Sequence, residues 1–263
     1  MRALQTAATG MAAQELNVQT ISNNIANLRT TGFKRQQVQF QDLLYENLRR
    51  AGASTSDQGN VIPAGLSIGS GVKTVSTPRD TSQGTLTSTS KPYDIAVRGE
   101  GYFKIRMPDG TNAYSRDGSF NLDAQGQMVN QNGYVLDPGI TIPQNATGVT
   151  ISAQGLVQAT MPGQTALQNI GTISLTRFIN KTGLNAIGDN LFQETPASGT
   201  PIDGTPSSEG FGNLLQNYLE DANVNAVTEI SGLIAAQRAY EMNSKVITAA
   251  DQMLSSTSQM FRG

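Results

Sequence analysis

Both ends of the chain carry the same apolar spacing, and this spacing limits the folds available to it. Apolar residues recur there at intervals of three and four, which is the period of helices that pack side by side. The N-terminal series is Leu4, Ala7, Met11, Val18, Ile21, Ile25 and Leu28, with polar Gln14 in step. The C-terminal series is Ala235, Ala239, Met242, Val246, Ala249, Met253 and Met260, with polar Ser256 in step. We therefore expect a long helix at each end.

The C-terminal helix carries a second apolar series beside the first. Its members recur every seventh residue and are Leu233, Tyr240, Ile247, Leu254 and Phe261. A hairpin of the two terminal helices would cover one series and leave the other exposed, and an exposed apolar seam usually indicates a partner. We interpret the two ends as surfaces that build a polymer. The residues expected at its interface are Leu4, Met11, Val18, Ile21, Asn24, Ile25, Asn27, Leu28, Leu233, Tyr240, Met242, Val246, Ile247, Met253 and Leu254.

The first helix is expected to run from about residue 2 to Leu28, and Gly32 can take the left-handed conformation that closes a helix. Asn24 and Asn27 near its end allow two interpretations. Either they loosen the last turns, because Asn is a poor helix former, or their amides hydrogen-bond to a neighbouring helix and fix its register. Because an isolated helix is marginal in water, the termini of a free monomer are expected to fold on assembly.

Between the helices, short strand-like runs alternate with turn sequences rich in Gly, Asn and Asp. The runs within residues 93–136 predict an antiparallel meander, which further runs extend to residue 195. They are 94–98, 102–107, 112–116, 119–122, 127–129, 134–136, 149–151, 156–159, 170–178 and 190–195. Residues 33–50 suit either a short helix or an extended segment, and residues 66–79 suit an extended chain.

This order predicts an α+β fold, with discontinuous terminal helices forming a coiled-coil-like domain around a central antiparallel all-β domain. Because the chain leaves one helix, builds the β body and returns, the helices are expected to pair antiparallel. The expected terminal helical assembly domain comprises 1–32 plus 224–263, and the β domain 91–195. An extended connecting region comprises 33–90 plus 196–223, with a flexible loop at 46–65.

The composition excludes several classes of function. Among 263 residues there is no cysteine and no histidine, so a thiolate metal site, a cysteine nucleophile and the usual histidine base are absent. We expect no cofactor and no metal. A net charge of -2 without a clustered basic face argues against nucleic acid and against a membrane-surface binder. No run approaches the roughly 18 apolar residues of a membrane span, and no cleaved secretory signal is expected.

Some carboxylates invite a catalytic or metal hypothesis. Residues 117–123 resemble the opening of a calcium loop but lack the sixth-position Gly and the distal Glu. Glu220 and Asp221 near Glu229 could be interpreted as a pair of glycosidase acids. We expect a hairpin turn in the first case and solvated carboxylates at a polar helix start in the second, and hence no enzyme.

Seven motifs resemble the rod and hook family of bacterial flagellar axial proteins. They are SNNIAN at 22–27, TTGFKRQ at 30–36, FQDLLY at 40–45, GYF at 101–103, YSRDGSF at 114–120, NVN at 223–225 and QRAYEMNSK at 237–245. Together they span nearly the whole chain, so the resemblance covers both the helical ends and the β body.

The resemblance implies a structural subunit of the distal rod, which polymerises helically into a hollow shaft that carries torque from motor to hook. It implies export through the flagellar type III apparatus and a place in the periplasm-spanning rod of the basal body. The implied partners are copies of itself, proximal rod and hook subunits, and ring bushing proteins. In this family a segment matching 46–65 helps to distinguish the stiff rod from the flexible hook. The alternatives are a proximal rod or hook subunit and, in another class, a secreted enzyme acting on the cell wall.

Overall fold

The computed structural model describes residues 2–51, 64–163 and 166–260, and it divides into two compact units. The helical unit consists of Met1–Ile25, Gln36–Pro78 and Asn225–Gly263. The β unit consists of Ala26–Arg35 and Arg79–Val224. Each unit is therefore assembled from segments that are far apart in the sequence.

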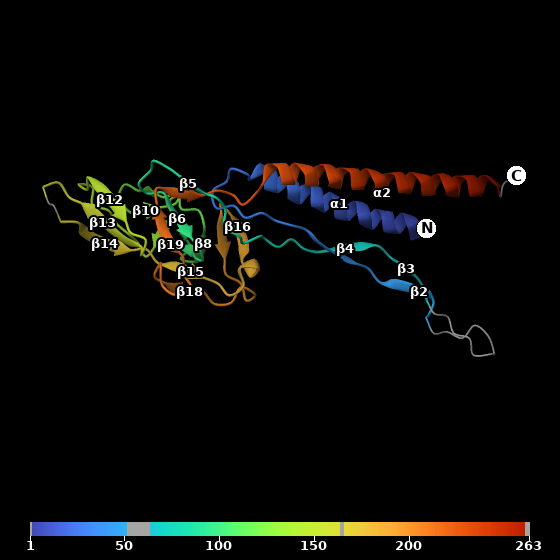
Figure 1. Ribbon diagram of the computed structural model, residues 1–263, viewed down its shortest axis with the longest axis horizontal. Helices are drawn as coiled ribbons and strands as arrows, with labels where there is room; N and C mark the ends of the chain where they lie inside the picture. The colour runs from blue at the N-terminus through green and yellow to red at the C-terminus, as the bar shows by residue number, and fades with distance from the viewer. Residues whose placement is uncertain (1, 52–63, 164–165, 261–263) are drawn as a thin grey trace. The chain divides into compact units, whose positions relative to one another are not determined.

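The helical unit is built on two long helices, α1 (Arg2–Ala26) and α2 (Ala226–Met260), which lie side by side (Figure 1). The facing pairs are Gly10 with Asn243, Ile21 with Gly232, and Asn24 with Glu229. Positions early in α1 meet positions late in α2, so the helices pair antiparallel as expected. A Cβ added at Gly10 would lie 2.9 Å from the side-chain nitrogen of Asn243, which shows how closely the helices approach.

The first helix ends at Ala26 and not at the expected Leu28. A turn replaces its last residues. The backbone N–H of Thr30 donates to the carbonyl of Asn27 at 3.1 Å, and the Thr30 hydroxyl donates to the Asn27 side-chain oxygen at 3.1 Å. Asn and Thr close turns of this kind in competition with the helix, and the helix therefore stops before its apolar series does.

In the helical unit, residues 36–51 and 64–78 form a two-stranded antiparallel ribbon. In it β1 (Gln39–Asp42) pairs with β4 (Val72–Ser76), and β2 (Tyr45–Arg49) pairs with β3 (Leu66–Gly69). Within 33–50 the extended interpretation is therefore confirmed and the short helix is wrong. Strand β2 covers the start of the expected loop 46–65, and residues 52–63 of that loop lie outside the described residues.

The β unit is made of short strands that pair antiparallel. They are β5 (Leu86–Ser88), β6 (Ile95–Arg98), β7 (Tyr102–Arg106), β8 (Asn112–Ser115), β9 (Asn121–Leu122), β10 (Met128–Val129), β11 (Val135–Asp137), β12 (Gly148–Ile151), β13 (Leu156–Thr160), β14 (Gln168–Thr172), β15 (Leu175–Arg177), β16 (Asn185–Gly188), β17 (Leu191–Gln193), β18 (Ile202–Gly204), β19 (Asn213–Gln216) and β20 (Tyr218–Glu220). A short 3-10 helix, η1 (Lys181–Gly183), precedes β16. The α+β fold with a central antiparallel β body is confirmed.

The connections between these strands differ from the expected meander. The largest sheet has the order β16-β17-β8-β7-β11-β10-β9, with β15 on β7 and β18 on β15. Strands β12, β13 and β14 form a second sheet, while β6 pairs with β19 and β5 with β20. Gly99-Glu100-Gly101 does not close a hairpin between β6 and β7, because β6 pairs with β19 instead. The Gly212 N–H, just before β19, donates to the Glu100 carbonyl at 2.7 Å.

The main core of the β unit joins strands from its beginning and its end. Ile95, Phe103 and Leu214 are buried in one cluster. Phe103 and Phe120 meet edge to face, with ring centroids 5.1 Å apart. Residues 196–223, expected to be a connection, therefore supply part of the β body itself, including β18, β19 and β20.

Candidate assembly surface

Asn24 joins α1 to α2 and to the segment that enters the ribbon. Its side-chain nitrogen donates to Glu229 Oε2 at 3.0 Å and to the Gln36 carbonyl at 2.8 Å, and its side-chain oxygen accepts from the Gln36 N–H at 2.9 Å. Asn24 and Glu229 are 0% and 1% exposed. Of the two interpretations of this asparagine, hydrogen bonding to a neighbouring helix is confirmed, and that helix belongs to the same chain.

The start of α2 places Glu229 for this contact. The Asn225 side-chain oxygen accepts from the backbone N–H groups of Val227 and Thr228, at 3.0 and 3.2 Å, which is the usual cap of a helix start. Glu229 lies in the first turn, where the helix dipole favours a carboxylate. The cap therefore fixes the turn from which Glu229 reaches Asn24.

The ribbon packs against α1 as α2 does. The Thr9 hydroxyl oxygen accepts from the Val72 N–H at 3.4 Å, and a Cβ added at Gly71 would overlap the same oxygen. Ala7 and Ala13 of α1 are buried. Small side chains on α1 thus let two neighbours approach it at once.

The second apolar series of α2 is partly covered. Leu233 and Ile247 are half-buried, beside the buried Ala236 and Ala250, whereas Tyr240 and Leu254 are exposed. The other series, apart from the half-buried Ala239, stays at the surface of the helical unit. We define the α2 stripe as its exposed members, which are Ala235, Met242, Val246, Ala249, Met253 and Met260. Met242 is 61% exposed and Met253 63%, so a single chain leaves this seam bare.

The last part of α2 extends beyond α1. The register that sets Gly10 against Asn243 brings Arg2, the first residue of α1, opposite Asp251. From Asp251 to Met260 every residue is exposed. Contacts with α1 therefore contribute nothing to this end of α2.

The ribbon has exposed apolar side chains as well. They are Phe40, Leu44, Tyr45, Leu48, Leu66, Ile68 and Val75, and Leu44 is 86% exposed. A two-stranded ribbon without a third strand is marginal in water. Its apolar side chains therefore form a second candidate surface for a partner.

The expected interface residues lie in different places. Ile21 and Asn24 are buried; Leu4, Met11, Val18, Ile25, Leu233 and Ile247 are half-buried; and Tyr240, Met242, Val246, Met253 and Leu254 are exposed. Asn27 and Leu28 belong to the β unit and are half-buried there. Phe261 of the second series lies outside the described residues.

The β unit contains a buried ion cluster that the sequence analysis missed. The Glu220 carboxylate lies 2.6 Å from Lys34 Nζ and 3.0 Å from Arg116 Nε, and the three side chains are 0%, 4% and 6% exposed. The expectation of a solvated Glu220 at a helix start is therefore wrong, because Glu220 ends strand β20. Glu229, expected to be solvated, is also buried.

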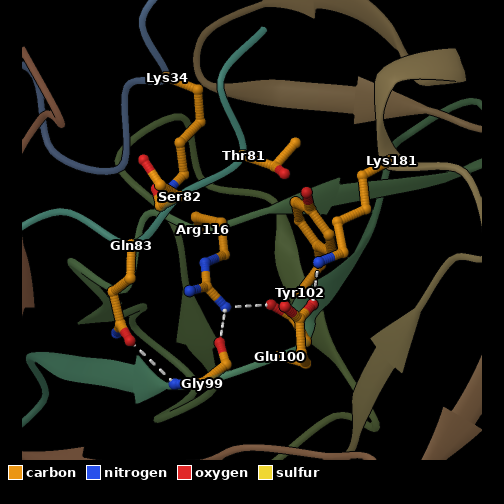
Figure 2. Close-up of a pocket in the computed structure, with 10 residues that line it drawn as sticks. Lys34, Thr81, Ser82, Gln83, Gly99, Glu100, Tyr102, Arg116 and Lys181 are labelled. Carbon is orange, nitrogen blue, oxygen red and sulfur yellow. Dashed lines mark hydrogen bonds and ion pairs between the residues drawn. The ribbon is translucent and has the colours of Figure 1, made fainter.

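A cavity of about 220 Å³ adjoins this cluster. Figure 2 shows the Arg116 guanidinium pointing to Gly99, and its Nη1 donates to the carbonyls of Gly99 and Gly101 at 2.9 and 2.5 Å. Burial lowers the pKa of the Lys34 ammonium, and the attraction of Glu220 opposes that shift. Burial also raises the pKa of Tyr102, which lines the cavity, to about 12.

The turn after α1 is fixed to the same cluster through its backbone. The Gly32 N–H donates to the Glu220 carbonyl at 2.7 Å, and the Arg35 N–H donates to the Asn223 side-chain oxygen at 2.7 Å. The Asn223 amide donates in turn to the carbonyls of Asp80 and Ser82, at 2.9 and 3.1 Å. The motifs at 30–36, 114–120 and 223–225 therefore meet in one place.

The carboxylate of Asp117 forms the expected turn. Asp117 Oδ1 accepts from the N–H and the hydroxyl of Ser119, at 3.0 and 2.6 Å. Within residues 2–51, 64–163 and 166–260, no group of three or more acidic side chains is placed to hold a metal ion. In that part of the chain no helix is both long and apolar enough to cross a membrane.

Comparison with known proteins gives matches along the chain. The family described as "Flagella basal body rod protein" matches residues 4–34, "Flagellar hook protein FlgE/F/G D1 domain" matches 96–159, and "Flagellar basal body rod FlgEFG protein C-terminal" matches 215–260. The flagellar basal-body rod protein FlgG of Caulobacter vibrioides is 57% identical over 260 residues, which cover 99% of each chain. The chain belongs to the FlgG family of flagellar basal-body rod proteins. FlgG of Bacillus subtilis is 36% identical over 97% of each chain, and FlgF of Escherichia coli is 31% identical over 96% of each.

As a member of the FlgG family, the chain is a structural subunit of the flagellar distal rod and acts within the basal body. The FlgG family is structural, so an enzymatic role is set aside. The lower identity to FlgF agrees with the distal position expected from the motifs. The resemblance to the rod and hook family is thus confirmed.

Proposed function

We propose that the chain polymerises helically with copies of itself into a hollow drive shaft, and that the α2 stripe is its principal contact surface. The observation that carries this proposal is the exposure of Met242, Val246 and Met253 along one line of a helix whose other apolar series is partly covered. Burial of one such side chain contributes about 1.5–3 kcal/mol. A stripe buried in every subunit of a long polymer therefore supplies a strong and repeated contact.

The expected domains receive roles in this proposal. The terminal helical domain, 1–32 plus 224–263, lines the inner tube, and the β domain, 91–195, forms the outer wall. Of the expected connecting region, 33–90 plus 196–223, residues 36–51 and 64–78 form the ribbon with its exposed apolar side chains, such as Leu44, and residues 196–223 belong to the β body. Neighbouring copies cover those side chains, so that the described ends of the segment 46–65, residues 46–51 and 64–65, become stiff by packing between subunits.

The finer partners follow from a position between motor and hook. They are proximal rod subunits at one end, hook subunits at the other and ring bushing proteins around the shaft. Export through the flagellar type III apparatus fits helices that are marginal alone in water. Torque then passes through the repeated contacts between copies.

The test is the assembly state of the purified full chain as its concentration rises, followed by sedimentation and electron microscopy. The proposal predicts tubes with a central channel above a threshold concentration. A chain that stays a fully folded monomer at millimolar concentration would contradict it.

A further inference from the structure

Glu220 is the point at which three earlier segments of the β unit meet. Its Oε1 accepts from Lys34 Nζ at 2.6 Å and from the Gly84 N–H at 3.0 Å, its Oε2 lies 3.0 Å from Arg116 Nε, and its carbonyl accepts from the Gly32 N–H at 2.7 Å. The side chain of Glu220 is fully buried. Glu220, near the C-terminal end of the β unit, therefore contacts three earlier segments: the chain after α1, the chain that leads into β5, and the chain that follows β8.

The charges of this cluster depend on Glu220. Two cations, Lys34 and Arg116, are almost completely buried, and the Glu220 carboxylate is the anion that contacts both. Burying a cation without a counter-charge is strongly unfavourable, and removing one partner of a buried pair leaves that cost uncompensated. Before Glu220 arrives, the two cations therefore oppose the closed packing of the β unit.

Glu220 also arrives late in synthesis. Lys34 precedes it by 186 positions and Gly84 by 136, and a chain is made from its N-terminus. Strand β5 pairs with β20, which contains Glu220, and β6 pairs with β19, which comes just before β20 in the sequence. A growing chain therefore holds both cations long before it holds their counter-charge.

We propose that Glu220 is a charge lock: the β unit completes its folding only when this carboxylate docks between Lys34 and Arg116, so a chain that ends before Glu220 stays open. The lock keeps a subunit from closing prematurely, which is of use to a chain that is exported before it folds. The proposal concerns the β unit alone and does not depend on polymerisation.

Variants that change the charge of the cluster but keep the shape of its side chains distinguish the proposed lock from an effect of packing alone. Glu220→Gln keeps the shape of the side chain and leaves two buried cations without an anion. Lys34→Met leaves Arg116 and Glu220 as a one-to-one pair, and the double variant leaves one cation. Refolding of the full chain is followed by pulsed hydrogen exchange, with Glu209→Gln on an exposed position as the control. We expect Glu209→Gln to refold at the wild-type rate.

The lock predicts that the amides of Gly32 and Gly84 gain protection last in the wild-type chain. It predicts that Glu220→Gln refolds at least tenfold more slowly, that Lys34→Met stays within threefold of wild type, and that adding Lys34→Met to Glu220→Gln restores most of the lost rate. If Glu220→Gln does not fold at all, a folded double variant supports the lock. A double variant that is no faster than Glu220→Gln, or that also fails to fold, would overturn it, because removing one of the two unpaired cations would then have relieved nothing.

Discussion

Asn24 and Glu229, 205 positions apart in the sequence, share a buried hydrogen bond of 3.0 Å between the two terminal helices. The same asparagine holds both the N–H and the carbonyl of Gln36. The register of the hairpin and the direction in which the ribbon leaves are therefore set by one side chain. The register decides which apolar series of α2 remains outside.

Asn24→Ala removes these three hydrogen bonds, one to the buried Glu229 and two to the backbone of the half-buried Gln36. We expect the helical unit to lose about 2–4 kcal/mol of unfolding free energy, because each hydrogen bond contributes about 0.5–1.5 kcal/mol. Denaturant unfolding followed by circular dichroism measures the loss. Asn27→Ala, in the turn after α1, is the matched control and should cost less than half as much. Equal losses in the two variants would count against the role given to Asn24.

Gly32 has two separate reasons to be glycine. Its φ is +70°, and a Cβ would lie 2.8 Å from the backbone nitrogen of Asp117. Gly133 has the same kind of φ, +83°, but open space around it. Gly133→Ala should cost about 1 kcal/mol from strain alone, and Gly32→Ala at least 1 kcal/mol more, since the clash with backbone adds to the strain. Thermal unfolding of the two variants compares the costs, and equal values would show that the backbone beside Gly32 yields easily.

Tyr102 makes the β unit sensitive to alkali. Burial raises its pKa from 10.0 to about 12 in the folded chain. Above pH 10 the unfolded chain loses a proton that the folded chain keeps, so the stabilisation is complete below pH 10 and is lost as the pH rises toward 12. The loss amounts to about 3 kcal/mol. Urea unfolding between pH 9 and 12 should therefore show a shallower decline for Tyr102→Phe than for the wild type, and identical declines would contradict this prediction.

The end of α2 should matter for assembly and not for the folded monomer. A chain that stops at Asp251 loses only exposed residues of α2. We expect its melting temperature as a dilute monomer to stay within about 2 °C of the full chain, because surface changes away from packed features are usually small, while its tubes disappear. Calorimetry and electron microscopy measure the two effects separately. Intact tubes from the shortened chain would show that this part of α2 is not a contact.

Local pattern was enough to predict the two helices, most strands between residues 94 and 195 and the α+β fold, but not β18, β19 and β20. The spacing of Met242, Val246 and Met253 is a property of the helix itself, and so it could be recognised without knowing what lies opposite. The strand order could not be predicted in this way. The pairing of β6 with β19 brings Gly212 close to Gly99, where an added Cβ would lie 3.1 Å from the Gly212 Cα. No local rule joins residues so distant in the sequence.

The ion cluster was missed for the same reason. Lys34 lies in an irregular segment just after the turn that follows α1, and Glu220 lies at the end of a short strand. Each looks like an ordinary solvated charge beside its own neighbours. Only the closed β unit brings them to 2.6 Å. Their burial is a property of the tertiary packing, and an isolated sequence pattern cannot report it.

The most direct test of the account is the effect of a charge on the α2 stripe. Met242→Glu places a carboxylate on the stripe, whereas Gln237→Glu places one on another exposed position of α2. The account predicts that both variants remain folded as dilute monomers and that only Gln237→Glu still forms tubes at the threshold concentration of the wild type. Tubes of unchanged yield from Met242→Glu would contradict it.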